Sequence, residues 1–133
     1  TYRPAIVVAN KLDSSEATQN LQELKRLASP ELNIVPVSCK TKAGLQKLGS
    51  QIFNALAIIR VYTKEPGERQ SSINPFILKR RSSVGDLARQ IHSDFIERFA
   101  YARVWAKRLP FSPQKVGSSF TLQDGDTVEL HAK

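Results

Sequence analysis

Residues Ala5-Ile6-Val7-Val8-Ala9 form a continuous apolar run in which no polar residue alternates. Such a run is typical of a strand that is buried on both faces of a parallel sheet. An amphipathic helix is expected next, because apolar residues recur on one helical face over residues 17–28, with Pro30 just beyond the end. Ser14 and Ser15 are available to cap this helix at its N-terminus.

A second strand and a second helix follow. Ile34-Val35-Pro36-Val37-Ser38 is another short apolar run, and apolar residues line one helical face from Gly44 to Leu56. Two strands joined by a helix in this way are expected to lie parallel, with a right-handed crossover. Residues 1–57 therefore predict a βαβα unit of the α/β class.

Near Ile58 the pattern changes to alternating strands, turn residues and scattered prolines, as expected at a domain boundary. Ser83 and Asp86 have the spacing of a capping box, which starts a helix whose apolar face runs from Val84 to Phe95. Alternation predicts strands on both sides of this helix, over residues 59–63, 76–78, 101–105 and 128–132, with a loop at 65–74 and a turn at 124–126. The order ββαβ…β over residues 58–133 is that of an α+β, β-grasp domain.

Composition limits the class of protein. The chain is 41% hydrophobic and 24% charged, which is ordinary for a globular protein. No apolar run approaches the roughly 20 residues of a membrane-spanning helix, and the start of the chain has no signal-peptide pattern, so we expect a cytoplasmic protein. Cys39 is the single cysteine, which allows no internal disulfide, and no cluster of Cys and His has zinc spacing.

The first candidate site is Asn10-Lys11-Leu12-Asp13, directly after the first strand and so at the carboxyl end of the sheet, where open α/β sheets bind ligands. These residues resemble the NKxD guanine-specificity motif of P-loop GTPases. A carboxylate at Asp13 can accept two hydrogen bonds from the Watson–Crick edge of guanine, which adenine cannot donate. By the resemblance, Asn10 orients the loop and bonds the base, and the stem of Lys11 lies against the purine. The alternative is a polar turn with a helix cap.

A second motif, Ser38-Cys39-Lys40, follows the second strand, where such GTPases have their SAK-type loop. In the family the backbone N–H of the middle residue approaches the guanine carbonyl oxygen, a role that permits Cys39 in place of Ala. The alternative for Cys39 is a small residue buried in the core. The two motifs in this order favour guanine recognition, because a strand precedes each of them.

The phosphate-binding motif of such enzymes, GxxxxGK[ST], is not found in the sequence. Without it the chain has no nest of N–H groups for phosphates and no hydroxyl for magnesium. We therefore expect that this chain alone does not hydrolyse GTP and that it contacts GTP or GDP through the guanine base only. The phosphate-binding half, with its Mg²⁺, is expected before Thr1 in a longer parent. Without that half, the open strand edge at Ala5 to Ala9 predicts either self-association of the fragment or a first half that is much looser than the second.

The net charge of +8 at pH 7 raises the question of whether the chain binds nucleic acid. The residues that could contact RNA are basic and lie in the second half of the chain: Lys79, Arg80, Arg81, Arg103, Lys107 and Arg108. Tyr101 and Trp105 are possible stacking groups beside them. The alternatives are that the basic run is a solvated turn and that Trp105 is a core aromatic. For His92 and His131, which have no nearby partner in the sequence, a structural role is favoured.

The second half also resembles a known family. The runs Ile59 to Lys64, Pro75 to Arg80, Val84 to Ala88, Tyr101 to Trp105 and Asp124 to His131 are similar to the successive blocks of TGS domains. Behind an NKxD and SAK pair, they resemble the DRG-like branch of the Obg-related GTPases over nearly the whole chain. The resemblance implies an α/β remnant of a P-loop GTPase domain at 1–57 and a ubiquitin-like β-grasp TGS domain at 58–133. It also implies an association with RNA or the translation apparatus.

Two functional hypotheses follow. In the first, residues 1–57 recognise guanine as the C-terminal part of a GTP-binding protein, and residues 58–133 recognise an RNA or a ribosome-associated partner. In the second, the chain is a protein–protein interaction module with no nucleotide role. A catalyst that acts independently of GTP has little support, because the sequence contains no acid–base or nucleophile constellation.

Overall fold

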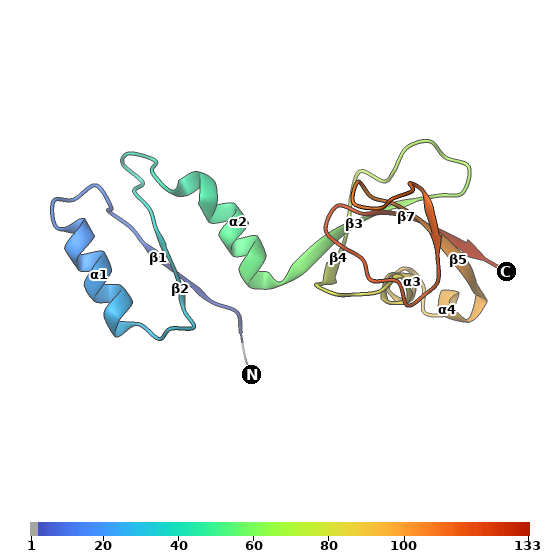
Figure 1. Ribbon diagram of the computed structural model, residues 1–133, viewed down its shortest axis with the longest axis horizontal. Coiled ribbons are helices and arrows are strands. Elements are labelled where there is room, and N and C mark those ends of the chain that lie inside the picture. Colours follow the sequence, from blue (N-terminus) through green and yellow to red (C-terminus); the bar gives the residue numbers. More distant parts are fainter. Residues whose placement is uncertain (1–2) are drawn as a thin grey trace. The chain divides into compact units, whose positions relative to one another are not determined.

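The computed structural model describes residues 3–133, and the chain divides into two compact units, residues 1–57 and 58–133 (Figure 1). Residues 1 and 2 of the predicted first unit lie outside the described part of the chain. Within residues 3–133, no helix has both the length and the apolar character that crossing a membrane requires.

The first unit contains β1 (Ile6–Ala9), α1 (Ala17–Leu27), β2 (Asn33–Pro36) and α2 (Leu45–Leu56) in the predicted βαβα order (Figure 1). The two strands pair in parallel, in a register that runs from Ile6 opposite Asn33 to Ala9 opposite Pro36. Both strands therefore end at the same edge of the sheet.

The predicted serine cap of α1 is wrong. The N-cap residue is Glu16, and its side chain makes no capping hydrogen bond. Ser14 instead closes two turns with its backbone: its N–H donates to the Lys11 carbonyl at 3.0 Å, and its carbonyl accepts from the Ala17 N–H at 3.1 Å. The loop that carries the first motif thus continues directly into the helix.

Gly44 fixes the start of α2 against the end of β2. Its φ angle of 77° lies in the left-handed region, and a Cβ at this position would stand 2.4 Å from the Pro36 carbonyl oxygen. Both facts favour glycine. Other residues are sterically strained at this φ angle, and the backbone oxygen of Pro36 cannot move away from an added Cβ without displacing the strand. The close contact between Gly44 and Pro36 therefore holds both ends of the loop that joins β2 to α2.

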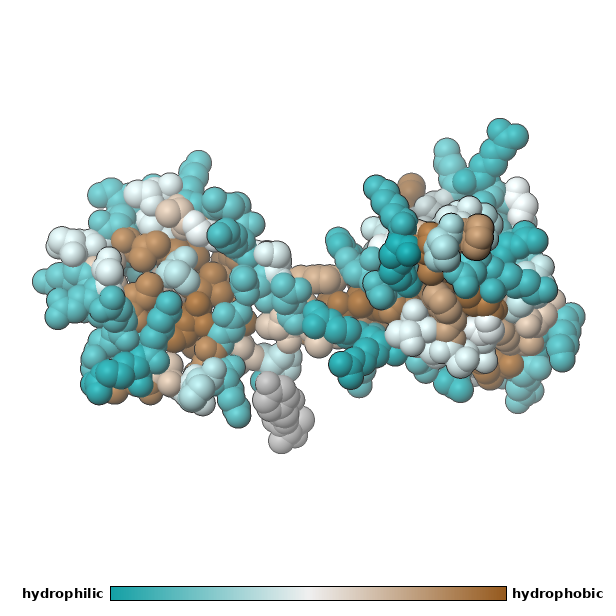
Figure 2. All heavy atoms as spheres, in the orientation of Figure 1, coloured by the Kyte–Doolittle hydropathy of each residue, from teal (hydrophilic) through white to brown (hydrophobic). Residues whose placement is uncertain are grey.

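The first unit buries little of its apolar surface. Among its described residues, neither helix contains a buried side chain, and the buried residues are Val35, Val37 and Ser38. Large apolar side chains remain exposed on strand and helices, among them Val8 at 44% and Leu27 at 70%. Figure 2 shows apolar atoms gathered over the strands between α1 and α2. Exposed apolar side chains that gather on one face are typical of a surface that contacts another part of a protein.

The second unit is a five-stranded mixed sheet with a helix. Its elements are β3 (Ile58–Lys64), β4 (Phe76–Lys79), α3 (Val84–Ile91), α4 (Phe95–Arg98), β5 (Phe99–Trp105), β6 (Gln114–Val116) and β7 (Thr127–Ala132). The strand order is β4-β3-β7-β5-β6, with β3 and β7 parallel and the other neighbours antiparallel. The sheet with its helix forms the β-grasp fold that the sequence predicts.

The capping box of α3 is confirmed. The Ser83 hydroxyl accepts from the Asp86 N–H at 3.2 Å, and the Asp86 carboxylate accepts from the Ser83 N–H at 2.8 Å. This backbone bond, together with the Ser83 hydroxyl, holds the pKa of Asp86 below its usual value. The helix buries Val84, Leu87 and Ala88, and thereby closes the core over one face of the sheet.

Two expectations for this unit need correction. The helix that begins at Val84 ends at Ile91, because His92 is extended, and Phe95 belongs to the separate short helix α4. The strand β6 was not expected at all; it is three residues long, too short for alternation to show in the sequence.

The close contact between Gly44 and Pro36 gives a prediction with a matched control in the same helix. Gly44→Ala should destabilise α2 by about 2 kcal/mol or more, because the new methyl group meets a backbone oxygen in a strained conformation. Gly49→Ala, where a Cβ meets nothing within 4 Å, should stabilise the helix by up to about 1 kcal/mol. Native-state hydrogen exchange of the α2 amides measures both, and equal effects of the same sign would contradict the account.

Candidate functional site

The two sequence motifs lie side by side at the carboxyl end of the parallel pair. Beyond the strands, the Val37 N–H donates to the Ala9 carbonyl at 2.8 Å, and the Leu12 N–H donates to the Val37 carbonyl at 3.0 Å. The backbone pairing thus continues into both loops. Residues 10–13 and 38–43 start from one edge and contact each other.

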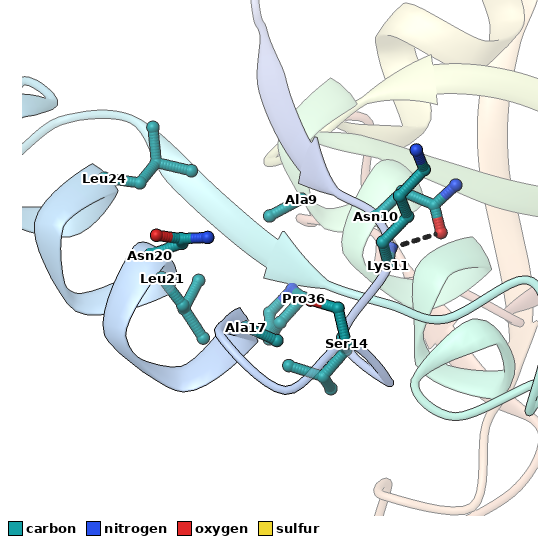
Figure 3. A pocket seen from close by; sticks show the side chains of 10 residues that line it. Ala9, Asn10, Lys11, Ser14, Ala17, Asn20, Leu21, Leu24 and Pro36 are labelled. Carbon is teal, nitrogen blue, oxygen red and sulfur yellow. Dashed lines mark hydrogen bonds between the residues drawn. The ribbon is translucent and has the colours of Figure 1, made fainter.

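A single oxygen atom connects the two loops. The side-chain oxygen Oδ1 of Asn10 accepts from the backbone N–H of Lys11 at 2.7 Å and from the backbone N–H of Cys39 at 3.2 Å. Figure 3 shows Asn10 and the first of these bonds at the end of β1. Within the described part of the chain, the Asn10 amide nitrogen donates to no protein group, so it is left to donate to a ligand.

A second connection runs between Asp13 and Ser38. The Ser38 hydroxyl donates to Asp13 Oδ1 at 2.5 Å and accepts from the Thr41 N–H at 3.1 Å. Ser38 is completely buried, and its N–H donates to the Ala43 carbonyl at 2.9 Å. A carboxylate has about four acceptor positions, so the bond from Ser38 orients Asp13 and leaves it able to accept more.

The other predicted base contacts are exposed. Lys11 has a φ angle of 64°, a left-handed conformation that is uncommon for a residue other than glycine and occurs often at functional sites. Lys40 and Cys39 are exposed as well, so the alternative role of Cys39 as a core residue does not hold. Because the Cys39 N–H already donates to Asn10, it must share or exchange this partner before it can donate to a guanine carbonyl.

A hollow of about 330 Å³ adjoins the site on one side. It lies between α1 and the strands, and its lining includes Asn10, Lys11, Asn20 and Pro36 (Figure 3). Asp13 and residues 38–40 do not line it. The structure thus brings Asn10 and Lys11 of the predicted set to this hollow, and hydrogen bonds between the loops join Asn10 to Cys39 and Asp13 to Ser38.

The predicted RNA residues fall into two separate groups. Lys79 ends β4, and Arg80 and Arg81 form the exposed turn after it. Arg103 lies on β5, which is separated from β4 by β3 and β7. Lys79 pairs with Ile58, whereas Arg103 is connected through Glu129 to Lys64, six residues further along β3. From strand spacings the two groups are about 14 Å apart across the sheet and about 20 Å apart along it.

Of the other predicted residues in this half, Lys107 is exposed, and Arg108 forms an ion pair with the buried Asp126, so its role is structural. His131 stacks on Tyr101 and contacts Glu129, as the structural alternative for this residue expected. The sequence did not point to Lys64 and Lys115, which lie over the rings of Trp105 and Tyr101. Lys115 was missed because it lies on β6, a strand that the sequence pattern did not predict.

Among residues 3–133, no group of three or more His, Cys, Asp or Glu side chains could hold a metal ion.

Comparison with known proteins identifies the family of the second unit. The TGS domain family matches residues 59–132. The chain belongs to the TGS-domain family. The match covers α3 and all five strands of the sheet apart from Ile58, and the resemblance of the second half of the chain to TGS domains is confirmed.

The similarity to known proteins extends through both units. The chain is 33% identical to human Developmentally-regulated GTP-binding protein 2 and 35% identical to Ribosome-interacting GTPase 1 of Saccharomyces cerevisiae, in each case over 99% of its length. It spans about a third (35%) of the length of each of these proteins. The DRG-like resemblance is therefore confirmed, for a region that includes both motifs as well as the TGS domain.

Solved structures have the same fold. A GTP-binding protein from Pyrococcus horikoshii OT3 matches 98% of this chain with a TM-score of 0.70 at 23% identity, and this chain covers 46% of that protein. The YchF GTPase of Schizosaccharomyces pombe matches 95% of the chain with a TM-score of 0.67. At these identities the likeness concerns the fold.

The contacts of Asn10 give a prediction for the two loops. Asn10→Ala removes the acceptor of the Cys39 N–H, and since such a bond contributes about 1 kcal/mol, exchange of this amide should become roughly fivefold faster. Asn10→Asp keeps an oxygen in the same place and should preserve the protection. Hydrogen exchange followed by NMR compares the variants, and unchanged exchange of the Cys39 amide in Asn10→Ala would show that the loops are held by something else.

Proposed function

We propose that residues 1–57 are the C-terminal part of a P-loop GTPase domain and bind the guanine base of GTP or GDP. One observation carries the proposal: the Asn10 oxygen joins the loop of the first motif to the backbone of Cys39 in the second. The relatives named as GTP-binding proteins support it, because the matched region includes both loops.

In this proposal Asp13 accepts from the ring N–H and the exocyclic amino group of guanine. The Ser38 hydroxyl holds one oxygen of Asp13 in place, so the carboxylate is oriented before the base arrives. The Asn10 amide nitrogen donates to the base, and the stem of Lys11 covers one face of the purine. The N–H of Cys39, which shares or exchanges its Asn10 partner, donates to the guanine carbonyl.

Phosphate binding and hydrolysis are assigned to the longer protein. Most of the affinity of P-loop proteins for nucleotides comes from phosphates, which are held by backbone N–H groups at a helix N-terminus and by magnesium. The chain supplies neither a GxxxxGK[ST] loop nor a cluster of metal-binding side chains among its described residues. We assign to residues 1–57 the choice of base alone.

The exposed apolar surface of the first unit supports this division. Val8, Leu24 and Ile52 are all more than a third exposed, as expected of elements that are covered by the remainder of a larger sheet. In the isolated 133-residue chain the same surface and the free edge of β1 favour self-association.

We further propose that the TGS domain recognises RNA or a ribosome-associated partner in the cytoplasm. Its exposed cations, on the turn after β4 and on β5, and the name of the yeast relative, Ribosome-interacting GTPase 1, favour this function. The competing possibility is a protein–protein interaction module, in which these cations only keep the surface solvated.

Removal of the Asp13 carboxylate tests the guanine assignment. The wild-type chain should bind GMP at about millimolar Kd and prefer it to AMP roughly tenfold, because phosphates contribute little here. Asp13→Ala should abolish the preference, since the double acceptor is lost. Glu16→Ala, which removes a nearby exposed carboxylate without a capping bond, should leave it unchanged.

Saturation-transfer NMR with GMP and AMP measures these affinities directly. Equal binding of both nucleotides by the wild-type chain would refute guanine recognition. A micromolar, magnesium-dependent affinity for GTP would instead refute the assignment of the phosphate site to the rest of the protein.

A further inference from the structure

The sheet of the TGS domain has two different faces. On β5, Ala102 and Val104 point into the core beneath α3, so the alternate residues Tyr101, Arg103 and Trp105 lie on the opposite face. The pairing register adds Lys115 from β6, Glu129 and His131 from β7, and Lys64 from β3. We call these seven residues the open face.

The register orders the open face into rows. Lys115, Arg103, Glu129 and Lys64 form one row across four strands. Tyr101 lies in the next row on one side, opposite His131, and Trp105 lies on the other side, opposite Thr127. The two aromatic rings are thus about 13 Å apart along β5, with cations between them.

The exposed charge of this face is positive. Glu129 is its single carboxylate, and it is only 4% exposed because Arg103, at 3.5 Å, and the Nε2 atom of His131, at 2.5 Å, cover it. The three cations, by contrast, reach the surface. Lys64 also lines a shallow pocket with Arg69 and Trp105, so a further cation stands beside the indole ring.

Two lysine ammonium groups lie over the aromatic rings of the open face, in cation–π contacts. The ammonium group of Lys64 lies 4.4 Å from the centre of the Trp105 ring, and that of Lys115 lies 4.2 Å from the centre of the Tyr101 ring. Such contacts are worth about 0.5–1 kcal/mol when exposed, so a stacking ligand can displace them. A nucleobase can then take the place of each ammonium, which moves on its flexible stem to the phosphate.

We propose that the open face is a platform for single-stranded RNA, a proposal that rests on the RNA-binding function proposed for the TGS domain. Unpaired bases stack on Trp105 and Tyr101, and Lys64, Arg103 and Lys115 contact the phosphates. A sheet with aromatic rings beside cations is an arrangement that binds unpaired bases, whereas a duplex presents no free base face. The turn at Lys79–Arg81 offers charge without an aromatic ring, lies away from the open face and takes no part in this platform.

Trp105 is the only tryptophan of the chain, so its fluorescence reports on this face without labelling. We expect saturable quenching when the full 133-residue chain is titrated with an oligouridine of about 12 nucleotides, and none with a duplex of equal length. Three phosphate contacts should make log affinity fall with log salt at a slope of about −2.

Variants separate charge from stacking. Lys64→Gln with Lys115→Gln should flatten the slope by about 1.4 units, because two phosphate contacts are lost. Tyr101→Leu should weaken binding roughly 5- to 100-fold and leave the slope unchanged, because only stacking is lost. Arg80→Gln with Arg81→Gln removes the same charge from the turn and should alter neither quenching nor slope. The melting curve of each variant, followed through Trp105, verifies folding.

Three results would overturn the assignment. RNA binding that leaves Trp105 unquenched and is lost in the Arg80 and Arg81 variant would move the site to the turn and preserve the RNA function. Failure to bind any RNA would remove this proposal and the RNA part of the function proposed for the TGS domain, and would leave only a ribosome-associated or other protein partner. Equally tight binding and quenching with poly-glutamate would make the open face a docking surface for acidic protein segments instead.

Discussion

The parallel pairing of β1 and β2 is the constraint on which the first unit depends. It ends both strands at one edge, so that the loops after Ala9 and Pro36 begin side by side. Two local devices then hold the loops in position: the Asn10 oxygen joins them, and the left-handed Gly44 lets α2 start against the Pro36 carbonyl. Guanine recognition, as proposed, depends on this geometry, which places the carboxylate of Asp13 and the groups of both loops around one base.

The two units obtain their stability in different ways. The TGS sheet buries a core of its own beneath α3, which leaves the opposite face of its strands available for cations and aromatic rings. The first unit has few buried residues among those described, and its helices leave apolar side chains exposed. Its site is therefore well connected locally but sits on elements whose packing is incomplete, which fits the proposal that a larger domain surrounds it.

Local patterns carried most of what the sequence predicted. The capping box at Ser83 and the helix after Gly44 each follow from residues close together in the chain, and the TGS assignment follows from several short runs in a fixed order. The failures have different causes, and only the last of the three that follow is non-local. The turn at Ser14 replaced a serine cap, the three residues of β6 were too few to show alternation, and the register that separates Lys79 from Arg103 is a property of the whole sheet. The base-contacting roles of Asn10 and Asp13 stay predictions.

The central claim is that guanine binds where the two loops meet, and ¹⁵N–¹H NMR of the chain with GMP and with AMP tests it most directly. The account predicts that GMP, far more than AMP, shifts the side-chain amide of Asn10 and the backbone amide of Cys39. The side-chain amide of Asn20, which lines the hollow beneath α1, should change little. Equal shifts with both nucleotides, or shifts centred on Asn20, would contradict it.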